Sequence, residues 1–135
     1  GAFSTNGYNI NNPGYTQFFK TTQIPNPTEI FVFLDEHPDS INDGYFLDKA
    51  PQKNVYVSGA NGVAYNNAKW TDLPASYHNG SATLAFADGH ASLHRWLDAD
   101  TLRPAQPNVA DLPREVKPGA HADFEWVMQH MSIEN

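Results

Sequence analysis

Residues 83–96, TLAFADGHASLHRW, decide the fold, because an Asp-Gly pair lies between two runs of strand-forming residues. Asp-Gly in this setting is the strongest short-range signal for a β-hairpin with a type I′ turn, in which both turn positions need φ > 0. A two-residue loop at Asp88 and Gly89 also fixes the register, so that Leu84 pairs with Leu93. The hairpin then has one apolar face and one mixed face. The apolar face carries Leu84, Phe86, Ala91 and Leu93, and the mixed face carries Thr83, Ala85, His90, Ser92, His94 and Trp96.

Further segments extend this hairpin into a sheet. Residues 28–34, TEIFVFL, form a continuous apolar run, which is typical of a buried central strand. Residues 44–48 and 54–58 predict two shorter strands. Residues 59–77 are expected to form a polar loop. The expected anchors of that loop are Trp70, Leu73 and Tyr77.

The C-terminal part of the chain changes in character. Four prolines between Pro104 and Pro118 exclude a helix and most strand pairing there. After them, apolar residues recur at the i, i+3, i+4 and i+7 spacing of an amphipathic helix, with Asp123 placed to cap or charge its first turn. The apolar residues of this stripe are Phe124, Val127, Met128 and Met131.

Composition limits the class of protein. The chain has 135 residues, 40% of them hydrophobic, which predicts a single packed domain over residues 1–135. The net charge of −7, with eight Lys and Arg, makes nucleic acid and anionic lipid improbable partners. The absence of cysteine excludes disulfides, thiol nucleophiles and Cys-ligated zinc. The fold class expected is α+β, an antiparallel sheet with a C-terminal helix and long ordered loops.

The hairpin segment also carries a resemblance, because nine residues separate His78 from the pair Asp88-Gly89. This spacing resembles that of the prepilin-type processing-associated H-x9-D-G proteins, which are relatives of the type II secretion pseudopilins. Three more segments resemble the soluble domain of that family. They are QIPNPT at 23–28 leading into FVFLDEHPDSINDGYF, then LPASYHNGSATLAFADGH, then DFEWVMQHMS near the C-terminus.

The resemblance implies a pilin-like structural subunit without enzymatic activity. Such a subunit is anchored in the inner membrane by an N-terminal helix, is processed by prepilin peptidase and assembles with other pseudopilins into a type II secretion pseudopilus or a type IV pilus-like fibre of the cell envelope. Its soluble domain is periplasmic or extracellular. The short basic leader and the apolar helix of about 20 residues that anchor such proteins are absent from this sequence, so this stretch of chain is expected to be monomeric.

The dense acidic loop at residues 35–44 has two interpretations. Its carboxylates suit a hard cation such as calcium, with Asp39, Asn42 and Asp43 as the candidate ligands. An EF-hand is excluded, because Ile41 and Ala50 occupy its third and twelfth positions. The alternative, which we favour, is a turn whose Asp and Asn side chains bond to nearby backbone amides. On that interpretation the protein has no cofactor.

His78 and Asp88 allow a structural or a chemical role. We expect the His78 imidazole to bond to Asp88, or to backbone near its turn, and so to tie the preceding loop to the hairpin with Gly89 at its tip. The rival hypothesis is a metal-dependent hydrolase that uses Asp35, Glu36, His78 and Asp88. No nucleophile motif accompanies those four residues.

Two further groups of residues are candidate sites. His90 and His94 have helical ligand spacing, but on a strand their Cα atoms lie about 13 Å apart, which is too far for one zinc ion. Tyr65, Trp70 and Tyr77 lie in one loop, where exposed aromatic rings suit a module that binds glycan or a partner protein. Large aromatic side chains more often anchor irregular loops to the core.

Overall fold

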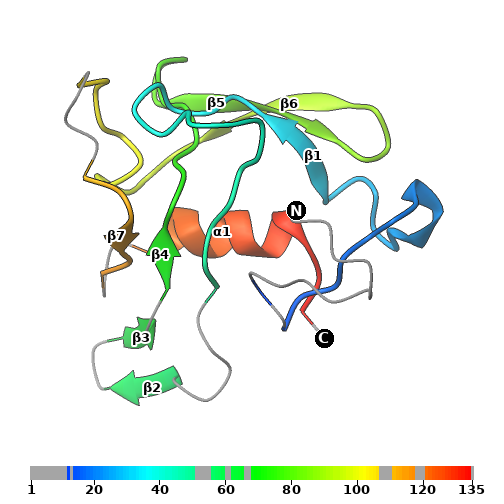
Figure 1. The fold of residues 1–135 in the computed structure, drawn as a ribbon, viewed down its shortest axis with the longest axis horizontal. Helices are drawn as coiled ribbons and strands as arrows, with labels where there is room; N and C mark the ends of the chain where they lie inside the picture. The colour runs from blue at the N-terminus through cyan, green and yellow to red at the C-terminus, as the bar shows by residue number, and fades with distance from the viewer. Residues whose placement is uncertain are drawn as a thin grey trace.

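The computed structural model describes residues 12, 14–50, 56–59, 62–65, 68–106, 111–117 and 121–134. These residues form a mixed α+β fold with antiparallel sheets and one α-helix at the C-terminal end (Figure 1). Three strands make the main sheet, in the order β1-β5-β6: β1 (Phe31–Leu34), β5 (Ser81–Phe86) and β6 (Ala91–Arg95). The α+β prediction is therefore confirmed at this level.

Smaller elements surround the main sheet. A 3-10 turn, η1 (Thr21–Gln23), precedes β1. Strand β2 (Tyr56–Gly59) pairs with β3 (Gly62–Tyr65), and β4 (Lys69–Trp70) pairs with β7 (Arg114–Glu115). The predicted strand at 44–48 is wrong, because these residues run as an irregular segment held by side chains. Of the predicted strand at 54–58, residues 54 and 55 lie outside the described residues.

The hairpin forms where the sequence predicts it, but its turn is longer by one residue. The amide of Gly89 donates to the carbonyl of Phe86 at 2.9 Å, and the amide of Phe86 donates to the carbonyl of His90 at 2.8 Å. Gly89 has φ 96°, whereas Asp88 is not among the described residues with positive φ. The loop is therefore a turn completed by a left-handed glycine bulge, not a type I′ turn.

This extra residue turns the side chains of β6 to the opposite face. Leu84 pairs with Ser92, and Thr83 pairs with Leu93, so the predicted register is wrong by one residue. Because side chains alternate along a strand, Leu93 moves to the outer face, where it is 64% exposed. His94 takes the inner position and stacks on Trp126, with ring centroids 3.6 Å apart.

Strand β1 is an edge strand, although its composition predicted a central one. A register irregularity between Phe31 and Phe33 marks a bulge, and Phe33 is left 74% exposed on the outer face. The central place belongs to β5, whose Ala82, Leu84 and Phe86 are buried. The apolar run at 28–34 does not reveal that its strand lies at the edge, because a bulged edge strand and a buried strand share the same composition.

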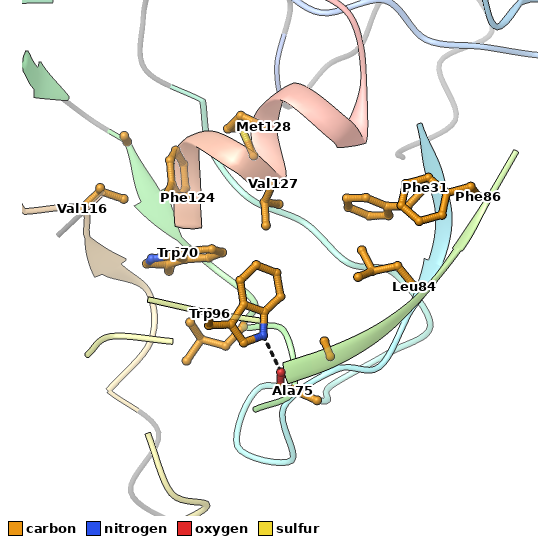
Figure 2. Packing of buried hydrophobic residues seen from close by; sticks show 13 residues of the cluster. Phe31, Trp70, Ala75, Leu84, Phe86, Trp96, Val116, Phe124, Val127 and Met128 are labelled. Carbon is orange, nitrogen blue, oxygen red and sulfur yellow. Dashed lines mark hydrogen bonds between the residues drawn. The ribbon is translucent and has the colours of Figure 1, made fainter. Parts of the chain in front are cut away.

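Helix α1 (Ala122–Met131) closes the core against the inner side of the sheet and strand β4 (Figures 1 and 2). Its predicted apolar stripe is confirmed, with Phe124, Val127 and Met128 buried. The ring of Phe124 meets that of Trp70 edge-on at 4.9 Å. Of the expected loop anchors, Trp70 and Leu73 are buried as predicted, whereas Tyr77 is 59% exposed.

The start of α1 is held by two carboxylates that exchange hydrogen bonds with backbone. Asp123 does not cap its own helix; its buried carboxylate accepts the amides of Leu97 and Asp98 at 2.9 Å and 2.8 Å and the hydroxyl of Thr101. The carboxylate of Asp98 in turn accepts the amide of Asp123 at 2.8 Å, which satisfies a free donor of the first helical turn. The helix is thereby fixed to the loop that follows β6.

Candidate functional site

His78 is bound to Asp35, not to Asp88 as predicted. Asp35 follows β1, and its amide donates to the carbonyl of Thr83 in β5 at 3.1 Å. The Asp35 carboxylate accepts the amide of Thr83 at 3.3 Å and lies 3.2 Å from the Nε2 atom of His78. Both side chains of the pair are partly exposed, at 46% for His78 and 38% for Asp35. His78 therefore ties the turn before β5 to the end of β1.

Asp88 acts within its own turn. Its carboxylate accepts the amide of His90 at 3.1 Å and contacts the Nδ1 atom of the same residue at 2.6 Å. These bonds to His90 lower the pKa of Asp88. The amide of Asp88 donates to the carbonyl of Pro27 at 3.1 Å. The tip of the hairpin is thereby joined to the segment that leads into β1.

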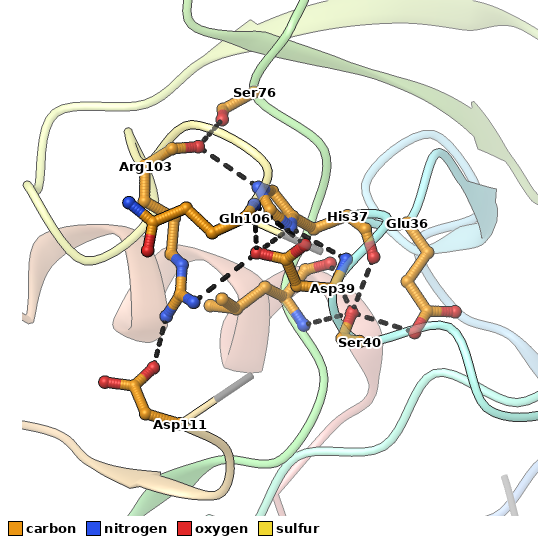
Figure 3. A network of polar contacts seen from close by, with 9 residues as sticks. Glu36, His37, Asp39, Ser40, Ser76, Arg103, Gln106 and Asp111 are labelled. Carbon is orange, nitrogen blue, oxygen red and sulfur yellow. Dashed lines mark hydrogen bonds and ion pairs between the residues drawn. The ribbon is translucent and has the colours of Figure 1, made fainter. Parts of the chain in front are cut away.

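The acidic loop after β1 is organised around the buried His37 (Figure 3). The Nδ1 atom of His37 accepts the amide of Asp39 at 3.2 Å, so Nε2 carries the proton and donates to the carbonyl of Arg103 at 3.1 Å. The hydroxyl of Ser40 bonds to Glu36 at 2.9 Å and accepts the amide of Leu73 at 3.1 Å. The loop is therefore packed and bonded on the body of the domain.

The three predicted calcium ligands do not share one environment. The side chain of Asp39 is only 2% exposed; its carboxylate accepts the amide of Gln106 at 2.9 Å and lies 3.5 Å from the guanidinium of Arg103. Asp43 accepts the amide of Tyr45 at 2.7 Å. The turn interpretation of this loop predicts such a bond from an Asp side chain to a nearby backbone amide. Asn42 is exposed. Calcium binding by these three residues stays a prediction.

Two further carboxylates, those of Asp48 and Asp72, lie beside each other, and the sequence does not predict this pair. Asp48 is fully buried, and one of its oxygens accepts the amides of Thr71 and Asp72 at 2.7 Å and 3.2 Å. Asp72 is also buried, and its Oδ2 atom accepts the amide of Leu47 at 2.6 Å. Each carboxylate thus bonds to backbone beside the other, although 24 residues separate them in the chain.

The remaining oxygens of this pair have no partner. The Oδ2 atom of Asp48 and the Oδ1 atom of Asp72 are buried without a hydrogen bond. Burial raises the pKa of Asp48 well above its usual range, and the charges of Asp72 and Glu36 add to that rise. Burial also raises the pKa of Asp72 and of Glu36. No local sequence pattern marks the pair, because FLD occurs at residues 33–35 as well as at 46–48, and long-range contacts are what bury Asp48 beside Asp72.

The four residues of the hydrolase hypothesis are divided among three local contacts. Asp35 and His78 meet, whereas Asp88 bonds to His90 and Glu36 bonds to Ser40. Within the described ranges, no three His, Asp or Glu side chains stand in an arrangement that would hold a metal ion. Of the aromatic residues considered for glycan binding, Trp70 is buried, Tyr77 is exposed, and the side chain of Tyr65 lies outside the description.

Comparisons with family models, with curated proteins and with solved structures found no match for this chain. Among the described residues, no helix is long and apolar enough to cross a membrane.

Proposed function

We propose that this chain is the soluble domain of a pseudopilin-like structural subunit, which assembles into a type II secretion pseudopilus or a type IV pilus-like fibre of the cell envelope. The proposal starts from the resemblance of three separated segments, one of which contains the spaced motif, to the H-x9-D-G proteins. Assembly would run through an apolar N-terminal helix encoded with this domain, and the partners would be other pseudopilins and the secretion or pilus machinery.

One observation carries the proposal: the three segments, the second of which contains the spaced motif, bond to one another in a single structural unit. Pro27, at the end of the first segment, accepts the amide of Asp88 in the hairpin turn. Asp35, at the end of β1, binds His78 of the spaced motif. Helix α1, the last segment, stacks Trp126 on His94 of the hairpin. The segments that resemble the family therefore build one domain, as a likeness that extends over the whole fold predicts.

The roles of the motif residues also favour a structural subunit over a hydrolase. His78 joins the turn before β5 to Asp35, Asp88 bonds within the hairpin turn, and Glu36 bonds to Ser40 in its own loop. An acid–base mechanism instead needs its groups within reach of one reacting atom. Asp35 and His78 share one contact, whereas Glu36 and Asp88 bond elsewhere, so the four groups do not surround one reacting atom.

The complete gene tests the proposal. We expect the coding sequence upstream of Gly1 to specify a short basic leader and an apolar helix of about 20 residues. We also expect cells that lack prepilin peptidase to accumulate a longer, unprocessed form of the protein, detected by its slower migration in gels. A product whose length does not depend on the peptidase, or an upstream region with no apolar helix, would contradict the proposal.

A further inference from the structure

We propose that Asp48 and Asp72 form a buried binding site for one calcium ion. The two carboxylates are brought together by long-range backbone contacts, and each one keeps an oxygen with no hydrogen-bond partner. This site is distinct from the loop residues Asp39, Asn42 and Asp43. It also does not depend on whether the chain assembles into a fibre.

The unpartnered oxygens are the first reason. A buried carboxylate oxygen without a donor is costly, and native proteins nearly always supply a proton donor, a water molecule or an ion. Here two such oxygens occur in neighbouring side chains, the Oδ2 atom of Asp48 and the Oδ1 atom of Asp72. The other oxygen of each group is held by backbone amides at 2.6–3.2 Å. The carboxylates are therefore fixed in place by one oxygen while the second stays available as a ligand.

The sign of the surrounding charge is the second reason. The charged groups that act on Asp48 are Asp72 and Glu36, and those that act on Glu36 are Asp72 and Asp43. These three groups, Asp72, Glu36 and Asp43, are all carboxylates, so the field at the pair is negative. A divalent cation neutralises that field, which a water molecule does not. Glu36 is half-buried beside the exposed Asp43, and the two extend the negative field from the pair toward the surface.

The choice of cation follows from the ligands. Carboxylate oxygens in a cysteine-free chain suit hard cations. Calcium accepts irregular geometry and takes backbone carbonyl oxygens and water as additional ligands, whereas magnesium demands near-octahedral coordination and retains its water. Because two side chains are too few for a complete shell, carbonyl oxygens and water would supply the rest. The irregular segment Leu47–Ala50 and the segment Thr71–Leu73 both run beside the pair.

Thermal unfolding of the 135-residue chain tests this site. The protein is prepared with a chelator, and its Tm is measured with and without calcium chloride. We expect a rise of roughly 10 °C at a hundredfold excess of calcium over Kd, because an ion that binds only the folded state stabilises it by mass action. An unchanged Tm in the wild-type chain would overturn the site.

Two substitutions locate the ion. Asp48→Asn and Asp72→Asn keep the oxygen that accepts the backbone amides but remove the charge, and each is expected to abolish the calcium-dependent rise. The control Asp39→Asn also removes a buried carboxylate charge and is expected to keep the rise. Persistence of the rise in both Asp48→Asn and Asp72→Asn overturns the proposal, as does its loss in Asp39→Asn alone, which would move the ion to the loop.

A second measurement covers the case in which either variant fails to fold. Terbium binds calcium sites and emits when a nearby indole transfers energy to it, and the buried Trp70 precedes Asp72 by two residues. The wild-type chain is expected to give terbium emission that is excited through tryptophan and is displaced by calcium. Trp70→Phe should remove most of that emission while preserving the Tm rise with calcium. Wild-type emission that is absent, or that calcium does not displace, would contradict the site.

Discussion

At the scale of single residues, His78 bonds to Asp35 and not, as the sequence predicted, to Asp88. The contact with Asp35 is a weak one. His78 and Asp35 form a partly exposed pair, and exposed pairs contribute only about 0–1 kcal/mol. Asp35 has a second function, because its carboxylate also accepts the amide of Thr83. The two partners of this contact are therefore unequal in their effect on stability.

We expect His78→Ala to lower the free energy of unfolding by at most about 1 kcal/mol. Asp35→Ala should lower it by about 1–3 kcal/mol, since the amide of Thr83 loses its carboxylate partner as well. Urea denaturation of the two variants and of the double variant measures both effects and their coupling. A loss in His78→Ala larger than that in Asp35→Ala would show that the pair is not organised as described.

Gly89 is a second residue-scale case, because it has φ 96° with nothing within 4 Å of the position of an added Cβ atom. A substitution there is opposed by backbone conformation alone. We expect Gly89→Ala to cost about 1–2 kcal/mol and Gly89→Val more, because a β-branched residue tolerates positive φ least. Gly44→Ala is the matched control: its Cβ also meets nothing, and its φ lies outside the left-handed range. Equal losses at Gly44 and Gly89 in urea denaturation would refute this reason.

At the scale of elements, the register of β6 is the main consequence of the longer turn. Leu84 is 1% exposed, whereas Leu93 on the neighbouring strand is 64% exposed. We expect Leu84→Ala to lower the free energy of unfolding by about 2–5 kcal/mol. Leu93→Ser should change it by no more than about 0.5 kcal/mol. Chemical denaturation measures both, and a large loss in Leu93→Ser would restore the register that the two-residue loop predicts.

The contact between β6 and α1 makes stability depend on pH. Burial lowers the pKa of His94, Asp123 opposes that shift, and His130 on the far side of Trp126 adds to it. Because the pKa in the folded chain lies below the usual 6.5, the unfolded chain binds more protons in this range. The contribution of His94 to the free energy of unfolding therefore decreases as the pH falls through 6.5.

His94→Gln removes this titration, so we expect its stability to depend less on pH than that of the wild type. Urea denaturation at about pH 7.5 and about pH 5.5, on either side of the usual pKa of histidine, measures the difference. A slope of wild-type size in His94→Gln would contradict the assignment.

The sequence predicts an element well where its own pattern decides the outcome. The stripe of α1 was predicted because a helix presents its i, i+3 and i+4 side chains on one face. The sequence predicts the position of the hairpin turn but not its length, since Asp-Gly occurs both in two-residue turns and in three-residue turns with a glycine bulge. Asp48 and Asp72 were missed because their burial depends on contacts across 24 residues, which no local pattern encodes.

At the scale of the whole molecule, the net charge of −7 opposes self-association of this stretch of chain. We therefore expect the 135-residue protein to sediment as a monomer at micromolar concentration and low salt. A tight oligomer in sedimentation velocity would contradict this expectation.

We propose that the protein is a structural subunit of a pilus-like fibre. Immunogold electron microscopy of the cells that make it, with antibodies raised against the 135-residue chain, is the most direct test. We expect label along short surface or envelope fibres, and loss of that label together with the fibres in cells lacking prepilin peptidase. Label spread through the cytoplasm, or fibre label that does not depend on the peptidase, would contradict it.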